Sequence, residues 1–213
     1  MTNIDMATLE IHGLPPSTFT RAVRLGCHEK SIDYTLVPAT PGAVVPLNPF
    51  AKIPAMVHGD LTLFESTAIL HYLDRTFAGP KLWPDDPRAA ALVDQWVGVV
   101  GDSVRNSAQL YMAARFNLLP APAEMVAKYL AKTREVIAAF DRQLGKTRFL
   151  AGDTLTAADL LFAPPYAYFA DIPELQAIAE ASPNCQRWAA EMAERPSFKA
   201  TEPATKPGLP TAA

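Results

Sequence analysis

The sequence feature that most constrains the fold is the stretch Phe50–Ser66, which reads FAKIPAMVHGDLTLFES. A short apolar run, Ala55–Val57, is followed by the turn residues Gly59–Asp60 and by a second run, Leu61–Leu63. Two such runs around a glycine-containing turn predict an antiparallel hairpin. Pro54 stands directly before the first run, where a strand can begin with a residue that has no N–H to donate. The chain is therefore built around a hairpin that starts at a proline.

A helix is predicted directly after this hairpin. Apolar residues recur there at helical spacing, at Ile69, Leu70, Leu73 and Phe77. Glu65 and Ser66 stand at the start of the helix, where free backbone N–H groups favour an anion. The extended backbone at Ile53–Pro54 is a second polar feature, because it can pair with a peptide. Together they favour a small acidic peptide as ligand, although the spacing also fits a hairpin followed by an ordinary helix cap.

The residues before the hairpin predict a strand, a helix and a second strand. Thr8–His12 alternates in polarity, and Tyr34–Val37 forms another short run. Between them Ser17 precedes an amphipathic helix, whose apolar positions are Phe19, Ala22, Val23, Gly26 and Cys27. Such a unit implies a parallel pair with a right-handed crossover. The resulting order, βαβ followed by ββα, is typical of a thioredoxin-like domain.

The sequence predicts two domains joined by a linker. Residues 1–80 form the thioredoxin-like domain, residues 81–87 the linker, and residues 88–213 an all-helical domain. We predict helices over 88–116, 123–144, 173–181 and 184–194, the first broken or kinked near Gly98 and Gly101. The pattern Thr156–Asp159 predicts a capping box at the start of a further helix. The tail 196–213 contains four prolines and is expected to be extended or disordered at its end.

Composition and charge exclude several classes of protein. The 213 residues carry a formal net charge of -3 with scattered lysines and arginines, so nothing indicates a nucleic-acid partner. No apolar run reaches the length that crosses a membrane, and the N-terminal residues lack a secretory-signal pattern. The two cysteines, Cys27 and Cys185, lie far apart in the chain, which fits a reducing cytoplasm. The histidines show no metal-ligand spacing, and we predict no metal site.

Two motifs around the hairpin resemble a known family. Lys52–Ala55 (KIPA) and Phe64–Leu73 (FESTAILHYL) look like the glutathione-binding half of a glutathione S-transferase. The resemblance implies that the bond before Pro54 is cis and that the Ile53 backbone pairs with the cysteinyl part of glutathione. It further implies that Glu65 and Ser66 hold the γ-glutamyl group.

A second match lies roughly 90 residues further on. Phe149–Asp159 (FLAGDTLTAAD) resembles the buried capping motif of this family's helical domain. Together the matches extend the resemblance from about Thr8 to about Glu194. They imply the cytosolic glutathione transferase fold, a thioredoxin-like domain followed by an all-helical domain. Thr156 and Asp159 then have a structural role.

The residue predicted to act on the glutathione sulfur is Ser17. A free thiol has a pKa near ~8.5 and reacts as the thiolate, so an enzyme must favour the anion. One hydrogen bond to a charged acceptor contributes roughly 1.5–3 kcal/mol, or about one to two pKa units. His12–Arg21 (HGLPPSTFTR) resembles the start of the serine-type phi class, in which the serine matching Ser17 bonds the sulfur. Thr18 is the rival hydroxyl, and Ser17 acting only as a helix cap is the alternative.

The sequence departs from the phi pattern at one place. Phi-type enzymes usually bind the glycine carboxylate of glutathione through basic residues in the loop that corresponds to Pro38–Pro49, and this loop contains no Lys, Arg or His. Lys52 is the nearby cation that can take over this task, or it is an ordinary solvated lysine. A disulfide-exchange role is disfavoured, because Ser17 stands where a thioredoxin has a reactive cysteine and Cys27 lies on the apolar helix face.

These observations predict a phi-like, serine-type glutathione transferase. It conjugates glutathione, its co-substrate, to a small hydrophobic electrophile in a detoxification-type reaction, and acts as a cytoplasmic homodimer without nucleic-acid or membrane partners. The predicted electrophile site comprises Leu14, Pro15, Tyr111, Met112, Arg115 and Phe116. Asp102 is a possible contact to the partner's glutathione. The alternatives are another glutathione-dependent enzyme (a peroxidase, an isomerase or an ether-cleaving enzyme) and a related binding protein without catalysis.

Overall fold

The computed structural model describes residues 8–205, which form two compact units. Unit 1 contains residues 8–83 together with residues 196–204, and unit 2 contains residues 84–195 together with residue 205. The chain thus leaves unit 1, builds unit 2, and returns to unit 1 near its C-terminus. The sequence alone assigns residues 196–204 to the helical domain, and the structure groups them with the sheet.

Unit 1 is built on a mixed sheet with the order β2-β1-β3-β4. Its strands are β1 (Leu9–Gly13), β2 (Thr35–Pro38), β3 (Ala55–His58) and β4 (Leu61–Phe64). The pair β1–β2 is parallel, and the pairs β1–β3 and β3–β4 are antiparallel. The predicted strands, the parallel pair and the hairpin are therefore confirmed.

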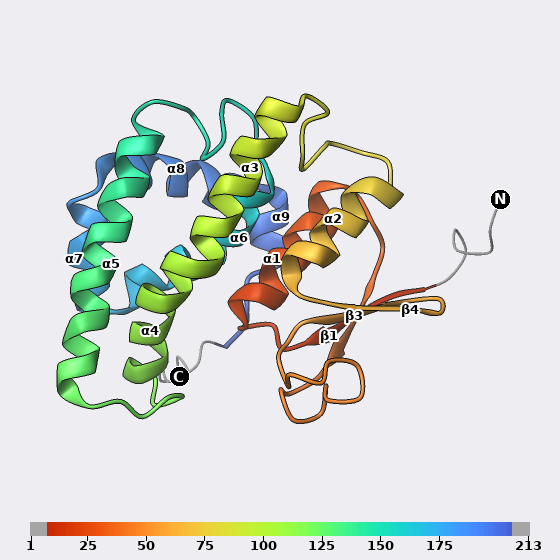
Figure 1. The fold of residues 1–213 in the computed structure, drawn as a ribbon, viewed down its shortest axis with the longest axis horizontal. Coiled ribbons are helices and arrows are strands. Elements are labelled where there is room, and N and C mark those ends of the chain that lie inside the picture. Colours follow the sequence, from red (N-terminus) through yellow and green to blue (C-terminus); the bar gives the residue numbers. More distant parts are fainter. Residues whose placement is uncertain (1–7, 206–213) are drawn as a thin grey trace. The chain divides into compact units, whose positions relative to one another are not determined.

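Two helices cover one face of this sheet. Helices α1 (Thr18–Glu29) and α2 (Ser66–Thr76) lie side by side, and α1 contacts β1 while α2 contacts β4 (Figure 1). Alternate residues of β1 are buried because the side chains of a strand point to opposite faces. The core residues supplied by the strands and the two helices include Leu9, Ile11, Val23, Leu25, Met56, Ile69, Leu70 and Leu73. The predicted thioredoxin-like arrangement is confirmed.

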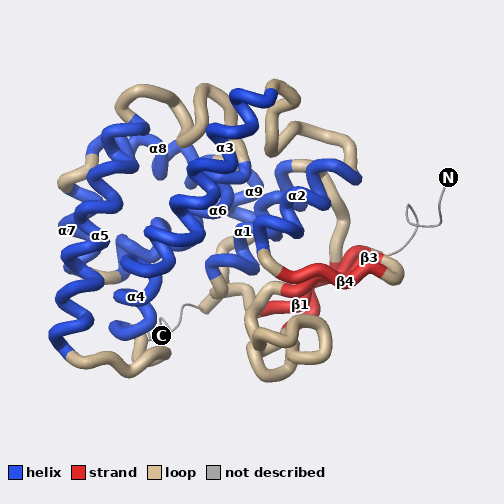
Figure 2. Tube along the Cα trace, viewed as in Figure 1, coloured by secondary structure: helices blue, strands red, loops and turns tan. Residues whose placement is uncertain are grey.

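The connection from β2 to β3 is the long irregular part of unit 1. Figure 2 draws it as loop throughout, and turns occupy residues 41–47. Asn48 is buried near its end and bonds at both sides: its Nδ2 donates to the Lys52 carbonyl at 2.7 Å, and its Oδ1 accepts the Phe50 N–H at 3.1 Å. This irregular loop therefore has a defined end, fixed by one asparagine side chain.

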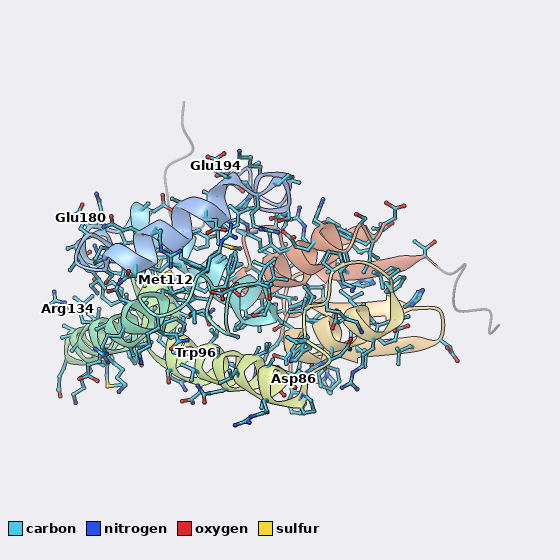
Figure 3. The ribbon with its side chains drawn as sticks, turned by 90° about the horizontal axis from the view of Figure 1, so that it is seen from above. Asp86, Trp96, Met112, Arg134, Glu180 and Glu194 are labelled. Atoms are coloured by element: carbon cyan, nitrogen blue, oxygen red, sulfur yellow. The ribbon has the colours of Figure 1, made fainter. Side chains whose placement is uncertain are left out.

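Unit 2 is helical throughout its regular elements. These are α3 (Pro87–Val99), η2 (Val100–Gln109), α4 (Leu110–Arg115), α5 (Ala123–Leu144), α6 (Ala157–Ala167), η3 (Tyr168–Asp171), α7 (Pro173–Glu180) and α8 (Pro183–Glu194). Its centre is aromatic, with Phe162 stacked on Trp188 at 4.9 Å between ring centroids and Trp96 edge-on to Phe140 at 5.0 Å. Figure 3 shows the side chains of this helical unit, with Trp96 and Met112 labelled. The all-helical prediction is confirmed.

The first long helix of unit 2 changes its winding where a break was expected. The segment η2 is π-helical and joins α3 to α4 without a gap in the helical backbone. It contains Gly101, while Gly98 lies in the last turn of α3. The interruption foreseen from the glycines is thus a change in hydrogen-bond spacing, a feature often found near functional sites.

The start of α6 holds a buried capping box. The Thr156 N–H and hydroxyl donate to one oxygen of the Asp159 carboxylate, each at 3.0 Å. The other oxygen accepts the Leu150 N–H and the Trp188 indole N–H, also at 3.0 Å. Burial raises the pKa of Asp159 to about 6, against the lowering effect of these four donors. The capping box is confirmed, and Asp159 additionally joins α6 to α8 and to the preceding loop.

The C-terminal tail departs from its prediction. Pro196–Ala200 forms the short helix α9, so the expectation of an extended tail is wrong for these residues. The reason is tertiary, because α9 packs against α1 and is not stabilised by its own sequence pattern. Residues 206–213 lie outside the described part of the chain.

Candidate active site

The strand register brings three predicted site segments to one end of the sheet. His12, at the end of β1, pairs with Ala55, at the start of β3, and Ala55 pairs with Phe64, at the end of β4. The turn to Ser17 follows β1, Ile53–Pro54 precedes β3, and Glu65–Ser66 follows β4. Residues that are up to 49 positions apart in the sequence therefore lie at the same end of the sheet.

Ser17 is the N-cap of α1. Its side-chain oxygen accepts the Thr20 N–H at 3.3 Å, and its own N–H donates to the Leu14 carbonyl at 3.0 Å. The side chain is half-buried, and α1 carries no acidic residue in its first turn. Because the cap uses an acceptor position of the hydroxyl, the hydroxyl proton can still be donated to an anion. The geometry is thus compatible with both the capping role and the predicted bond to sulfur.

Gly13 and Thr20 fix the first turn of α1 to the end of β1. A Cβ atom at Gly13 would lie 2.4 Å from the Thr20 Oγ1, so only glycine fits there without a shift. Thr20 is fully buried, and its hydroxyl has no hydrogen-bond partner within the described residues. This close approach sets where Ser17 stands relative to the sheet edge. Sequence reasoning missed it, because the approach joins the end of a strand to a helix and only the fold brings the two together.

The Ile53–Pro54 peptide bond is cis, as the resemblance implied. Pro54 is buried at the start of β3 and Ile53 is half-buried beside it. Just before them, Ala51 has a φ of 51°, in the left-handed region that favours glycine. Asn48 holds this bend through its bond to the Lys52 carbonyl. The Asn48–Pro49 pair was the available sequence signal, because this dipeptide marks turns.

Glu65 and Ser66 form the junction between β4 and α2. Glu65 is exposed and has a φ of 68°, an unusual conformation for a residue with a side chain. Its carboxylate makes no capping bond to α2. Ser66 is the first residue of α2 and is 7% exposed. Because α2 has no acidic residue in its first turn, its positive end is not neutralised by its own side chains there.

Lys52 is exposed next to this edge. The preceding loop buries Val44 and carries no cation of its own. The position of Lys52, one residue before Ile53, keeps it available as the cation of the predicted glutathione site. Its contact with the glycine carboxylate remains a prediction.

The residues predicted for the electrophile site lie in both units. Leu14 and Pro15 are half-buried in the turn before Ser17, in unit 1. Tyr111, Met112, Arg115 and Phe116 lie at the end of the first long helix of unit 2. Tyr111 and Met112 are buried, whereas Arg115 is exposed. Their common role stays a prediction.

The carboxylate of Glu174 in unit 2 acts on two of these residues. Arg115 lies 3.5 Å from the Glu174 carboxylate of α7. The pKa of Tyr111 is raised first by burial and then by the negative charge of Glu174. Asp102 in η2 is exposed and accepts the Asn106 amide at 3.0 Å. Glu174 had no sequence signal, because only packing brings α7 beside α4.

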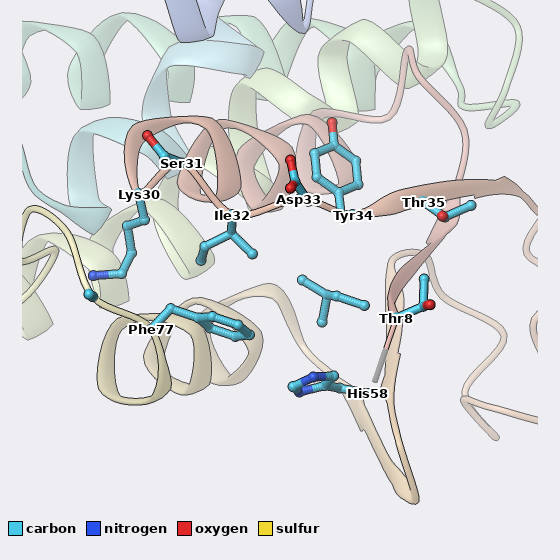
Figure 4. Close-up of a pocket in the computed structure, with 11 residues that line it drawn as sticks. Thr8, Lys30, Ser31, Ile32, Asp33, Tyr34, Thr35, His58 and Phe77 are labelled. Atoms are coloured by element: carbon cyan, nitrogen blue, oxygen red, sulfur yellow. The ribbon is translucent and has the colours of Figure 1, made fainter. Parts of the chain in front are cut away.

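A separate cavity lies at the opposite end of the sheet from Ser17. It has a volume of about 600 Å³ and is lined by the segment 30–34 between α1 and β2, the starts of β1 and β2, the end of β3 and the two residues that follow α2 (Figure 4). Leu9, Ile32, Phe77 and His58 stand around it, and His58 bonds the Tyr72 hydroxyl at 2.8 Å. None of the predicted site residues lines this cavity.

Both cysteines are buried free thiols. Burial raises the pKa of Cys27 to about 12, with Arg24 acting in the opposite direction. Burial and the Asp141 carboxylate raise the pKa of Cys185 to about 12. Over residues 8–205, no helix is long and apolar enough to cross a membrane, and no three His, Cys, Asp or Glu side chains are grouped to hold a metal ion.

Comparison with known proteins gives matches over most of the chain. A family model for the N-terminal domain of glutathione S-transferase matches residues 11–81, and one for the C-terminal domain matches residues 99–196. Glutathione S-transferase F13 of Arabidopsis thaliana is 31% identical over 210 residues, covering 92% of this chain and 95% of the relative. Glutathione S-transferase 3 of Zea mays is 33% identical over 212 residues, covering 92% and 94%.

Solved structures agree with these relatives. Glutathione transferase F7 from Populus trichocarpa superposes with a TM-score of 0.82 at 29% identity, covering 91% of this chain and 97% of its own. Glutathione S-transferase I from maize, in complex with an atrazine glutathione conjugate, gives a TM-score of 0.81 at 26% identity, covering 92% and 97%.

Proposed function

Because this chain belongs to the glutathione S-transferase family, we propose that it conjugates the glutathione thiolate to hydrophobic electrophiles and that Ser17 stabilises this thiolate. The supporting observation is the sheet register, in which Ala55 pairs with both His12 and Phe64. This pairing brings the Ser17 hydroxyl, the Ile53 backbone before β3 and the N-terminus of α2 to one end of the sheet. A tripeptide with a thiol between two charged ends needs those three features close together.

The thiolate is favoured by two groups of α1. The Ser17 hydroxyl donates to the sulfur while its oxygen continues to accept the Thr20 N–H. The N-terminal end of α1 adds a positive potential that its own side chains do not neutralise in the first turn. Together they hold the sulfur as a nucleophile near neutral pH, and the rest of the rate comes from positioning.

The remaining parts of glutathione are held by the hairpin segment. The Ile53 backbone pairs with the cysteinyl unit at the bend before β3, where the Ile53–Pro54 bond is cis. Glu65 and Ser66 take the γ-glutamyl amine and carboxylate, the latter at the start of α2. Lys52 takes the glycine carboxylate in place of the basic loop residues.

We assign the electrophile to an apolar site that uses Leu14, Pro15, Met112 and Phe116, with Tyr111 and Arg115 as its polar members. The maize relative that was solved with an atrazine glutathione conjugate supports a hydrophobic, ring-containing substrate class. Turnover of aryl halides against alkyl peroxides, measured on the same preparation, separates conjugation from peroxidase chemistry.

We further propose a homodimer that works in the reducing cytoplasm. Exposed apolar side chains in each unit, such as Phe50 and Leu118 at 64% exposure, are candidates for the contact between subunits. Two buried cysteines without a disulfide support the compartment. Light scattering of the purified chain gives the oligomeric state directly, and a monomer at micromolar concentration contradicts the dimer.

The deciding experiment is an ultraviolet titration of the thiolate of bound glutathione. In Ser17→Ala the thiol pKa should rise by about one to two units, because the lost hydrogen bond to an anion is worth about 1.5–3 kcal/mol. Thr18→Val is the matched control and should leave the pKa unchanged. An unaltered thiolate fraction in Ser17→Ala, or a shift in Thr18→Val alone, removes Ser17 from the mechanism.

A second candidate, a glutathione-binding protein without catalysis, is favoured by the absence of cations in the loop 38–49. Retention on immobilised glutathione together with an aryl-halide assay distinguishes the two. Retention with no conjugation under saturating glutathione supports the binding protein, and conjugation at any measurable Ser17-dependent rate excludes it.

A further inference from the structure

The end of the chain packs on the helix that begins at Ser17. After α8 the chain returns to unit 1, where α9 (Pro196–Ala200) contacts α1 (Figure 1). We call residues 196–203 the C-terminal segment. The matched family domains end at residues 81 and 196, so nearly all of this segment lies outside both.

Arg21 is the centre of the contact. Its side chain is buried, with 4% of the residue exposed, and its Nη2 donates to the Phe198 carbonyl at 3.0 Å. Its Nε lies 3.4 Å from the Thr201 hydroxyl oxygen, and its guanidinium stands 4.0 Å from the centroid of the Phe198 ring. A buried guanidinium is stable only where its donors find acceptors. The C-terminal segment supplies acceptors and an aromatic face to this one.

A second arginine repeats the arrangement one turn later. Arg24 donates through Nη1 to the Thr201 carbonyl at 3.3 Å and through Nε to the Tyr34 hydroxyl at 3.0 Å. At the C-terminal end of α1, the Ser197 hydroxyl bonds the Glu29 carboxylate. Thr201 is fully buried, and its hydroxyl also donates to the Ser197 carbonyl at 2.9 Å. The segment therefore contacts α1 from its first turn to its last.

These contacts reach the candidate catalytic serine through one turn of helix. The Arg21 N–H donates to the Ser17 carbonyl at 2.8 Å, so the residue held by the C-terminal segment closes the first turn of α1. The close approach of Gly13 and Thr20 holds this turn against β1, and the bond from Arg21 to the Phe198 carbonyl holds it against the C-terminal segment. A small rotation of this turn moves the Ser17 hydroxyl away from the sulfur. A displacement of about 1 Å between reacting groups can lower the reaction rate by a large factor.

We propose that the C-terminal segment is a positioning element of the active site: through Arg21 it holds the first turn of α1 so that the Ser17 hydroxyl points at the glutathione sulfur. This inference rests on the proposed function, because it needs Ser17 as the donor. Arg21 and Thr201 are positioning residues in it, since neither is assigned a contact with glutathione.

The test uses the full chain with Thr201→Val, which keeps the shape of the side chain and removes the hydroxyl that bonds both Arg21 and Ser197. The thiol pKa of bound glutathione should rise, and conjugation at pH 6.5 should fall about tenfold, as a loss of Ser17 alignment predicts. Thr201→Ser, which keeps the hydroxyl, should restore both values. Glu202→Gln, an exposed change in the same segment, should alter neither.

A stability role alone gives a different result. If Thr201→Val lowers the melting temperature while the thiol pKa and the pH profile of kcat/KM stay at their wild-type values, the segment does not position Ser17. Where Thr201→Val does not fold, Arg21→Lys in the full chain, which keeps the charge but loses the guanidinium donors to Phe198 and Thr201, answers the same question by the same titration.

The double variant Ser17→Ala with Thr201→Val separates this inference from the proposed function. If Thr201 acts through Ser17, adding its substitution to Ser17→Ala causes no further pKa rise. A further rise overturns the positioning role but leaves Ser17 as donor. No pKa change in Ser17→Ala itself overturns the proposed function, and the positioning role with it.

Discussion

Two helix N-termini in this protein share a hydroxyl residue at the cap and differ in their surroundings. Helix α1 follows Ser17 and helix α6 follows Thr156, so each begins at a hydroxyl residue. Three residues on, α6 has Asp159, whose carboxylate binds Thr156 within a fully buried site. At the same position α1 has Thr20, and its cap is half-buried.

The difference shows what makes one cap structural and the other available for chemistry. At α6 an anion of the protein itself, the Asp159 carboxylate, neutralises the positive end of the helix. Four N–H and O–H groups donate hydrogen bonds to it. At α1 no side chain of the first turn supplies a negative charge. An anion from outside, such as a thiolate, is therefore favoured at α1 and excluded at α6.

The largest effect is expected where the internal anion is removed. Asp159→Ala leaves buried donors of Thr156, Leu150 and Trp188 without an acceptor, and we expect a loss of about 3–5 kcal/mol of unfolding free energy. Chemical denaturation followed by circular dichroism measures it. Asp153→Ala, an exposed change six residues earlier, is the control and should stay within about 0.5 kcal/mol of wild type. A loss below 1 kcal/mol for Asp159→Ala contradicts the buried-anion account.

The second prediction places an anion at the open helix end. Ser17→Asp keeps a good N-cap, so the melting temperature should stay near that of wild type. The carboxylate then stands where the thiolate must form, and conjugation should fall more than about 100-fold through like-charge repulsion and the lost donor. Steady-state kinetics with an aryl halide measures this loss.

Ser17→Ala provides the contrast for this variant. It should lower the stability by about 1 kcal/mol through the lost cap, and its conjugation rate should fall less than that of Ser17→Asp. Activity of Ser17→Asp within a few-fold of wild type, with the fold intact, shows that the end of α1 is an ordinary cap.

The third prediction concerns the other open helix end, at Ser66. Ser66→Ala removes the proposed donor to the γ-glutamyl carboxylate, and glutathione binding should weaken about 10-fold or more, since a hydrogen bond to a charged group contributes about 1.5–3 kcal/mol. KM for glutathione should rise while kcat changes little, because the lost contact is the same in ground and transition states. Isothermal calorimetry with Thr62→Ala as an exposed control checks the direction; an unchanged Kd places the carboxylate elsewhere.

The sequence predicts the elements of both units because their signals are local. The helix over Ala123–Leu144 is found at its predicted bounds, and the hairpin follows from Pro54 and the turn residues Gly59–Asp60. The capping box at Thr156 is visible for the same reason, since its two members are three residues apart. Local patterns also placed Ser17 at the start of α1.

The contacts that position the site are missed because they join distant residues. Thr201 bonds Arg21 across 180 positions, and only the fold brings α9 to α1. The positive φ of Glu65 depends on how the chain turns from β4 into α2, and the residue type at this position does not predict that turn. Glu174 likewise meets Arg115 through packing alone. Sequence reasoning thus identified the groups of the candidate site and not the residues that hold them.

A smaller effect is expected at Lys52, which is exposed. Lys52→Met removes the proposed partner of the glycine carboxylate, and glutathione affinity should fall only about two- to fivefold, because exposed charge pairs contribute about 0–1 kcal/mol. The loss should shrink as salt is added, since the interaction is screened. Lys81→Met, an exposed lysine beyond α2, is the control. Equal affinity at low salt makes Lys52 an ordinary surface lysine.

The smallest expected effect is at the two cysteines. It tests whether the reactive thiol is that of glutathione or one of the protein's own cysteines. With the pKa of each thiol raised to about 12, a fraction of only ~10⁻⁴ is thiolate at pH 8, and burial blocks access as well. Iodoacetamide should therefore leave the native protein unlabelled by mass spectrometry while modifying both cysteines in denaturant. Rapid native labelling of Cys27, which lies on the same helix as Ser17, would mean that α1 carries a reactive cysteine after all. The contrast between the two helix ends would then no longer suffice to explain the chemistry, because the nucleophile would be a residue of the protein.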